Sequence, residues 1–491
     1  MKSNDVREAS NDVRDPRRWW TLVVLCLSVL VLGVDGTVLN LAIPSLIRDL
    51  GATPGDIQWI LDAYVLAFAG LLLTAGSLSD RYGRRKFLII GLAFFGGASL
   101  LAVLAAEPWQ LIGARALMGV GGSILMPSTL SILMTVFDEA ERRKAMAAWS
   151  AVAMVSVIAG PTLGGFLLDH YWWGSVFLLN VPIAGLAIVA ALVLMPETRS
   201  SGRRIDPVGV VLSVVGLTAA VYVIIEREWN VAGIATAVVA LGAFVVWEMR
   251  SEHPMLPLEL FRNRNFSGAS FSILLMSFGA GAVMLMLTQY LQFVLGYGPM
   301  KAGLALLPYA VAAALFNGLG AALGQRVSNR VLVGAGMVVM AGGFAVLATT
   351  TGYLPVLTGL MVMGVGGGLA GPAAYASLMG AIPVEHAGVG SALNDTVQQV
   401  GLAMSIAILG SVLAGVFTSA MPAGVPAAAK ESIGDAIRLG FAEPAKAAFT
   451  DAVHLGAWVG GGFCVAAALL ALAVLRPPAP AVTPEPEPER V

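Results

Sequence analysis

Apolar runs of about 20 residues recur along this chain of 491 residues, and short polar turns separate most of them. A run of that length crosses the hydrocarbon core of a bilayer as an α-helix. Only 12% of the residues are charged, which is about half the share that is usual in soluble domains. The sequence therefore predicts an all-α, polytopic membrane protein.

The runs group into two blocks of six, and two further runs lie between the blocks. We therefore expect fourteen transmembrane helices, in two six-helix bundles plus two extra central helices. One of these spans is expected at 266–295. The predicted segments are a cytoplasmic N-terminal segment (1–19), the N-terminal bundle (20–198), the two inserted helices (199–250), a cytoplasmic connection (251–265), the C-terminal bundle (266–476, with an outer loop at 419–451) and a disordered cytoplasmic tail (477–491).

The distribution of Lys and Arg predicts the orientation. Of the 29 basic residues, 22 lie in loops on the side of the N-terminus, 6 lie on the other side, and Arg115 lies inside a span. Because basic loops stay in the cytoplasm, both termini should be cytoplasmic in a plasma or inner membrane. The Ala-rich outer loop is expected to form a short surface helix.

The remaining composition excludes several classes of partner. A net charge of -1 gives no reason to expect a nucleic-acid partner. Cys26 and Cys464 lie in separate spans, so neither a disulfide framework nor a cysteine metal site is expected. The sequence contains no P-loop, no H-E-x-x-H and no nucleophile elbow. No metal, no cofactor and no enzymatic activity are therefore predicted.

An internal repeat gives the organisation of the two blocks. The segment from Arg115 to Pro127 recurs from Leu360 to Pro372, a displacement of 245 residues, and the same displacement carries Leu78 onto Leu323. Parallel halves related by an axis along the membrane normal are a transporter architecture, with the substrate site between the halves.

The turn after the second span reads G-S-L-S-D-R-Y-G-R-R-K from Gly76. It matches the pattern G-x-L-x-D-R-x-G-R-[RK], and through it the chain resembles the major facilitator superfamily. The resemblance implies a gate motif made of Gly76, Asp80, Arg81, Gly83 and Arg84, in which Asp80 caps a helix or pairs across the seam between the halves. The alternative is a topology signal alone.

A second motif lies in the fifth span, where G-P-T-L-G-G begins at Gly160. It is similar to the motif that marks exporters of the same superfamily, although Ser156 stands where these exporters often have glycine. Pro161 removes a helix hydrogen bond, and Gly164 and Gly165 permit close packing, so this antiporter kink can bend and slide. A plain kink in a crowded bundle is the alternative.

The first span contains L-G-V-D-G-T-V-L-N around Asp35, which resembles fourteen-span drug:proton antiporters of the EmrB/QacA type. Asp35 and Arg115 should lie at comparable depth, face the protein interior and pair. Protonation of Asp35 would then loosen the pair and couple protons to transport. The alternative is a permanent structural ion pair. Asn40, at the end of this motif, is assigned to the substrate cavity.

Polar residues on three later spans complete the predicted cavity. The thirteenth span carries a stripe in which Asp395 is expected to join proton coupling, while its amides either line the cavity or bond between helices. The ninth and tenth spans contribute further candidates. The substrate-cavity set is Asn40, Gln289, Tyr290, Gln292, Asn317, Asn394, Gln398 and Gln399. Asp62 and Tyr64, in the second span, are either cavity or interfacial residues.

These features predict a proton-coupled exporter of lipophilic, often cationic, drugs or biocides that works by alternating access. Without an ATPase motif the energy must come from an ion gradient, and titratable carboxylates favour H⁺, with Na⁺ left open. An exporter of a lipid, a siderophore or a self-made antibiotic is an alternative, as is a non-transporting sensor on the same scaffold. The expected partners are the bilayer, small lipophilic substrates and protons, and the resemblance implies a monomer.

Overall fold

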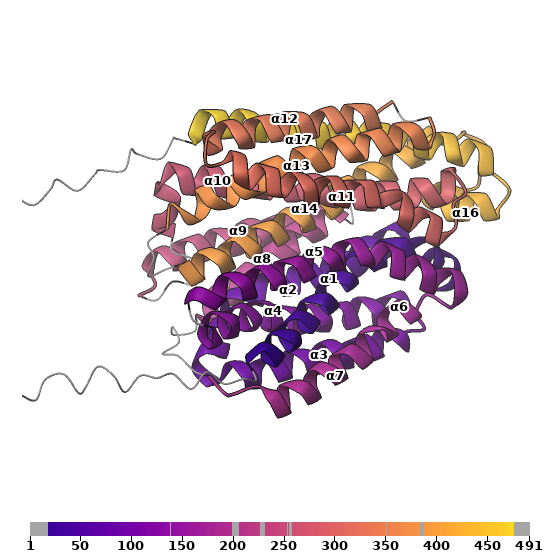
Figure 1. Cartoon of the computed structure of the whole chain (residues 1–491). Helices are drawn as coiled ribbons and strands as arrows, with labels where there is room; N and C mark the ends of the chain where they lie inside the picture. Colours follow the sequence, from indigo (N-terminus) through magenta and orange to yellow (C-terminus); the bar gives the residue numbers. More distant parts are fainter. Residues whose placement is uncertain are drawn as a thin grey trace, which may run out of the picture.

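The computed structural model describes residues 18–137, 139–198, 206–225, 231–252, 254, 258–349, 351–382 and 387–475. All regular secondary structure in these residues is helical (Figure 1), which confirms the all-α prediction. Most of the N-terminal segment predicted at 1–19 and the whole tail predicted at 477–491 lie outside the described residues.

The N-terminal half is a bundle in which two of the long helices begin at strong capping signals. The side chain of Thr53 accepts a hydrogen bond from the backbone N of Asp56, and Pro54 occupies the first helical position, where its missing N–H costs nothing. Pro108 begins the fourth helix in the same way. The helices are α1 (Arg18–Asp49), α2 (Pro54–Tyr82), α3 (Arg84–Val103), α4 (Pro108–Val136), α5 (Glu139–His170), α6 (Ser175–Leu178) and α7 (Asn180–Leu194).

The C-terminal half repeats this arrangement. Its elements are α10 (Arg264–Gln289), the π-helical turn η2 (Tyr290–Val294), α11 (Pro299–Leu323), α12 (Asn329–Leu347), α13 (Tyr353–Met379), α14 (Ala387–Ala420), α15 (Ala427–Glu431), α16 (Ile433–Arg438) and α17 (Ala442–Val474). The first residues of α11, α12 and α13 follow those of α2, α3 and α4 by 245 positions each. The helix boundaries thus reproduce the displacement in the sequence.

Two helices are inserted between the halves, α8 (Pro207–Ile225) and α9 (Val231–Arg250), followed by the short η1 (Leu258–Arg262). They pack on each other, and α8 also contacts α2 of one half and α14 of the other. Figure 1 shows the pair beside α14 and α2. The insertion therefore covers one of the seams between the two bundles.

Fourteen long helices are present among the described residues. Thirteen are long and apolar enough to cross a membrane, when α6 and α7 are taken as one span and α10 with η2 as another. The remaining long helix is α5, which has 32 residues and packs against α1 and α11. This arrangement agrees with the predicted fold of two six-helix bundles and an inserted pair.

Two elements differ from the sequence prediction. The span expected at 266–295 is α-helical only to Gln289, after which Leu295 N donates to Tyr290 O over 3.1 Å in a π-type turn. The outer loop expected at 419–451 forms two short helices instead of one, and α17 already begins at Ala442. These helices define one end of the bundle, called the outer end here because the basic residues predict that it faces outward (Figure 1).

The two halves meet near this outer end. A Cβ atom placed on Gly303 of α11 would lie 2.1 Å from the Pro161 carbonyl oxygen of α5, and one on Gly165 would lie 2.5 Å from Met300 Cα. On the opposite seam, Gly410 of α14 packs directly on the Gln58 side chain of α2. At these points the helices of the two halves lie in close contact.

Candidate transport site

The centre of the N-terminal half contains a buried ion pair. Arg115 Nη1 donates to Asp35 Oδ2 over 2.6 Å. Asp35 is 4% exposed and Arg115 is 2% exposed, so both charges are removed from solvent. A single charge at this depth would cost about 2.5 to 3.5 kcal/mol on insertion scales. The expected pairing of these two residues is therefore present in the structure.

Neighbouring polar groups hold each member of the pair. Arg115 Nε donates to the Ile60 carbonyl oxygen of α2 over 3.2 Å, and its Cζ atom lies 4.3 Å from the centroid of the Tyr64 ring. The Asn180 side chain at the start of α7 donates to Asp35 Oδ1 over 3.0 Å and to Ser99 Oγ over 3.2 Å. The pair is thus held from α2, α3 and α7.

The ion pair is confined to one half of the repeat. At the 245-residue displacement, Ala280 stands for Asp35 and the buried Leu360 stands for Arg115. Asp35 lies on α1, and the side chains that bond its carboxylate come from α4 and α7 of its own bundle. The roles of Asp35 and Asp395 in proton coupling remain predictions.

The opposite face of α1 packs against α5 through the predicted antiporter kink. A Cβ atom on Gly160 would lie 1.9 Å from Thr37 Oγ1, and one on Gly164 would lie 2.7 Å from Val38 Cγ1. One turn away the roles are reversed, because a Cβ atom on Gly33 of α1 would lie 1.8 Å from Ser156 Oγ. The serine that departs from the exporter pattern thus fits against a glycine of the neighbouring helix.

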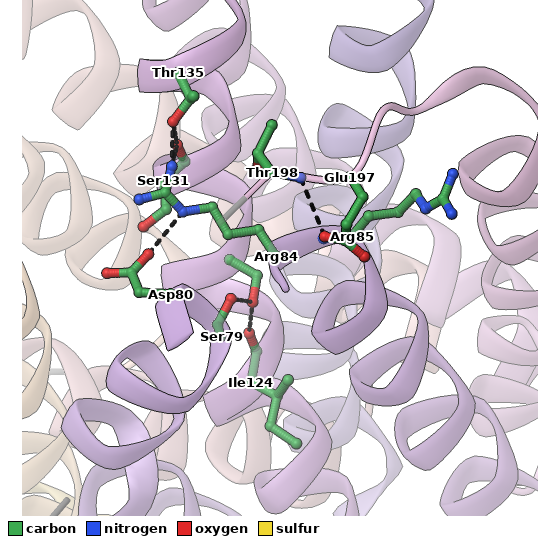
Figure 2. Close-up of polar contacts among 10 residues, drawn as sticks. Ser79, Asp80, Arg84, Arg85, Ile124, Ser131, Thr135, Glu197 and Thr198 are labelled. Carbon is green, nitrogen blue, oxygen red and sulfur yellow. Dashed lines mark hydrogen bonds and ion pairs between the residues drawn. The ribbon is translucent and has the colours of Figure 1, made fainter. Parts of the chain in front are cut away.

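The predicted gate motif closes the turn between α2 and α3 (Figure 2). Arg84 Nε donates to Asp80 Oδ1 over 2.7 Å, while Arg84 Nη1 donates to the Ser131 carbonyl oxygen over 3.2 Å and also to Thr135 Oγ1. Gly76 permits close contact with Pro127 of α4. Arg84 therefore joins the end of α2 to the end of α4.

Glu197, which the sequence analysis did not identify, completes this turn. Its carboxylate accepts hydrogen bonds from the backbone N atoms of Arg85 and Lys86 over 3.1 and 3.2 Å, at the positive end of the α3 dipole. Gly83 has a φ of 124°, and a Cβ atom there would lie 2.9 Å from Glu197. Both the backbone conformation and the close approach require glycine at this position.

Asp80 was expected either to cap a helix or to pair across the seam, and among the described residues it makes no pair across the seam. Asp80 pairs with Arg84 of its own half, and Arg81 lies over the ring of its neighbour Tyr82 with 5.3 Å between Cζ and the centroid. The physical reason is the position of the close contacts described above between the halves, which lie at the outer end and not at the end that carries this turn.

The predicted cavity residues of α14 remain together near the start of that helix. Asn394 is buried, and its Nδ2 atom donates to Asp395 Oδ1 over 3.1 Å. Asp395, Gln398 and Gln399 are half-buried. The structure thus keeps one amide and one acid in contact on this helix.

The other predicted cavity residues are dispersed. Gln292 Nε2 donates across the halves to the Leu41 carbonyl oxygen over 3.0 Å. Tyr290 and Asn40 are buried, whereas Asn317 is exposed on α11. Gln289 lines an outer cavity of about 510 Å³ together with Gln58, Glu431 and neighbouring residues of α1, α14 and α17. The predicted set does not form a single cluster.

The structure gives more reason than the sequence did to regard Asp62 as a functional residue. It is 0% exposed, and neither carboxylate oxygen has a hydrogen-bond partner among the described residues. It lies one turn below Gln58 on the face of α2 that meets α14. An ionisable side chain in that environment is a candidate functional residue by default.

The sequence is similar to those of known membrane transport proteins. The sequence profile of the Major Facilitator Superfamily matches residues 25–406 and 269–490. The multidrug efflux pump LfrA of Mycolicibacterium smegmatis is 34% identical over 91% of this chain and 92% of its own length. The methyl viologen resistance protein SmvA of Salmonella typhimurium is 32% identical over 86% of this chain and 89% of its own.

A solved structure has the same fold. The crystal structure of a bacterial homolog of the human lysosomal transporter Spinster, in an inward-facing and occupied conformation, superposes with a TM-score of 0.70 at 16% identity, and the alignment covers 94% of this chain and 97% of that one. The profile spans most of the sequence, and two relatives match over most of their lengths. The chain therefore belongs to the major facilitator superfamily, and it is a multi-pass membrane transporter.

Proposed function

We propose that this transporter exports lipophilic, often cationic, compounds in exchange for protons. The observation that carries the proposal is the buried pair of Asp35 and Arg115, with Asn180 on the second carboxylate oxygen. A carboxylate that is paired inside the bundle changes its interactions when it binds a proton. An ion gradient can do work through such a group only if the two protonation states favour different conformations.

The environment of Asp35 suits both protonation states. Asn180 Nδ2 donates to the ionised carboxylate, while its own Oδ1 atom has no hydrogen-bond partner among the described residues. Rotation of this amide by half a turn would present an acceptor to the hydroxyl of a protonated Asp35. Arg115 would keep the Ile60 carbonyl and the Tyr64 ring as partners. The ion pair can therefore separate while the guanidinium group keeps these two contacts.

The packing of α1 gives a route from Asp35 to the seam. Asp35 points to α4 and α7, while Thr37 and Val38 contact Gly160 and Gly164 of α5. The next glycine of α5, Gly165, contacts α11 of the other half. Because tightly packed helices move as units, a small shift of α1 on protonation would alter the closure of the outer end.

The substrate class rests on the relatives and on the acids near the seam. The names of two relatives state multidrug efflux and resistance to methyl viologen, and methyl viologen is a flat organic dication. Two carboxylates can attract such a cation: Asp62 on α2, and Asp395 on α14, which accepts a hydrogen bond from Asn394. We assign both termini to the cytoplasm, the coupling ion to H⁺ and the working unit to a monomer.

Transport by proteoliposomes with an imposed pH gradient tests this function. Purified protein is reconstituted and ethidium movement is followed by fluorescence, with the gradient in either direction and after its collapse by an ionophore. The unmodified chain should move the dye only with a gradient, and Asp35→Asn should abolish that movement. Asp49→Asn is the matched control, because Asp49 ends the same helix on the surface and pairs with Arg48; its transport should be unchanged.

Three other results are informative. Gradient-driven transport that persists in Asp35→Asn would contradict the coupling role. Dye movement that depends on a Na⁺ gradient and not on pH would replace the proton by sodium. Dye binding without movement under any gradient would favour a sensor on the same scaffold.

A further inference from the structure

The inserted pair of helices encloses a cavity that transport as proposed does not use. Its volume is about 910 Å³, which includes the part that opens to the surface of the bundle. It lies between α8 and α9 on one side and α2, α10 and α14 on the other, near the end of the bundle opposite α16. The lining residues are Ala69, Gly70, Ser213, Leu217, Leu241, Phe244, Phe261, Ser270, Phe271, Leu274, Leu393, Thr396, Val397 and Val400.

The walls of this cavity select an apolar occupant. None of its fourteen lining residues is charged, and three of them are phenylalanines. Protein interiors rarely leave voids larger than a water molecule, and water does not fill a large apolar cavity readily. A space of this size in a membrane protein is therefore expected to hold hydrocarbon.

One buried polar group beside the cavity has no hydrogen-bond partner among the described residues. Ser270 lines it, is 3% exposed, and its hydroxyl has no hydrogen-bond partner among the described residues. The Ser213 hydroxyl, by contrast, donates to the Val210 carbonyl oxygen over 3.0 Å. A buried hydroxyl without a partner is unfavourable. The occupant should accordingly bring one hydrogen-bonding group, such as an ester oxygen, to Ser270.

The position of the cavity indicates where the occupant comes from. Phe271 is 51% exposed on a membrane-spanning helix and also lines the cavity, so the cavity reaches the surface of the helical bundle. No carboxylate lines it, although the candidate transport acids Asp62 and Asp395 lie on helices that do. A cationic substrate would therefore find no counter-charge there, whereas a lipid chain would need none.

We propose that this cavity binds one acyl chain of a membrane phospholipid, with its ester group near Ser270, between the inserted pair and the two halves. Because Ala69 of α2 and Val397 of α14 belong to different halves, the bound chain would favour the arrangement of the halves seen here. The inserted helices would then serve to make a lipid site at one seam. This inference does not depend on proton coupling.

Photolabelling in nanodiscs tests the proposal. The protein is reconstituted with phosphatidylcholine that carries a diazirine in one acyl chain, irradiated, digested and mapped by mass spectrometry. Labels are expected on peptides of α8, α10 and α14 that contain lining residues. Val397→Trp, which fills the cavity, should reduce those labels by about fivefold or more. Leu217→Phe adds less side-chain volume to the cavity and should reduce the labels to a smaller extent.

The control is Val239→Trp, because Val239 is 67% exposed on α9 and does not line the cavity; its labels should equal those of the unmodified chain. Saturating tetraphenylphosphonium should leave the labels unchanged. Labelling confined to other peptides, or equal labelling in both cavity variants and the control, would overturn the proposal. Displacement of the label by tetraphenylphosphonium would also overturn it and assign the cavity to transported cations.

Discussion

Arg115 Nη1 lies 2.6 Å from Asp35 Oδ2, and the two residues come from helices α4 and α1, 80 positions apart in the chain. Both side chains are 3% exposed. A double-mutant cycle measures what this contact contributes. Asp35→Asn or Arg115→Gln alone leaves one buried charge unpaired and should destabilise the protein by about 3 to 5 kcal/mol.

In that cycle the double variant should be more stable than the sum of the single effects predicts, by about 1 to 3 kcal/mol. Unfolding is followed thermally in one detergent for all four proteins. The double variant should still fail to couple dye movement to a pH gradient, because position 35 no longer carries a carboxyl group. Strictly additive effects on stability would show that the two charges do not depend on each other.

Asn180 is expected to act on turnover more than on binding. Asn180→Leu removes a hydrogen bond to a charged group, worth about 1.5 to 3 kcal/mol, so gradient-driven dye transport should fall by about tenfold or more. Dye affinity, measured by equilibrium binding, should change by less than about twofold, since Asn180 touches Asp35 and Ser99 and lines neither cavity described above.

Ser99→Ala is the control for that variant, because it removes a partner of Asn180 and leaves the contact with Asp35 in place. Its transport should stay close to that of the unmodified chain. Equal losses of transport and of binding in Asn180→Leu would point to a general disturbance of the bundle and not to a role at Asp35.

Closure of the outer end depends on glycines that a methyl group would displace. Gly165→Ala and Gly303→Ala should push α5 and α11 apart, since their added Cβ atoms meet backbone at 2.5 and 2.1 Å. The readout is labelling of Gln289→Cys, which lines the outer cavity, by a membrane-impermeant maleimide. Cys26 and Cys464 are replaced by alanine in this background.

Labelling at position 289 should increase by about threefold to tenfold in both glycine variants, if the clash shifts the population by about 1 kcal/mol or more. Gly97→Ala serves as the control, because a Cβ atom there meets nothing within 4 Å. Unchanged labelling in Gly165→Ala and Gly303→Ala would show that these contacts do not hold the outer end closed.

Asp62 is predicted to lower stability in the native chain. Because neither oxygen has a partner among the described residues, Asp62→Leu should raise the free energy of unfolding by about 1 to 3 kcal/mol. Thermal unfolding in detergent measures the change, and dye transport should fall in parallel if Asp62 serves function. A loss of stability would mean that the carboxylate is satisfied by a group other than the described residues.

Much of the fold was predictable because the membrane imposes it. Lipid offers no hydrogen bonds to the backbone, so each apolar run of sufficient length must become a helix. Pro54 and Pro299, 245 residues apart, begin α2 and α11, and that displacement is visible in the sequence. The π-helical turn at Tyr290 was not predictable, since it depends on how α10 meets its neighbours and not on local propensity.

The site was predictable only in part. The pairing of Asp35 and Arg115 was predictable because the distance of each residue from the outer end of its helix follows from the rise of an α-helix. Asn180 and Glu197 carry no local signal: one lies 145 residues from the carboxylate that it contacts, and the other lies 112 residues from Arg85. A partner across the seam was one of two roles expected for Asp80, but its partner depends on which end of the bundle is closed.

Proton release on substrate binding tests the central claim most directly. Purified protein in weakly buffered detergent is mixed with tetraphenylphosphonium, and a pH-indicator dye records the protons released per protein. If Asp35 exchanges its proton during transport, the unmodified chain should release protons, Asp49→Asn should release the same number, and Asp35→Asn should release fewer. Equal release from Asp35→Asn and the unmodified chain would contradict the account.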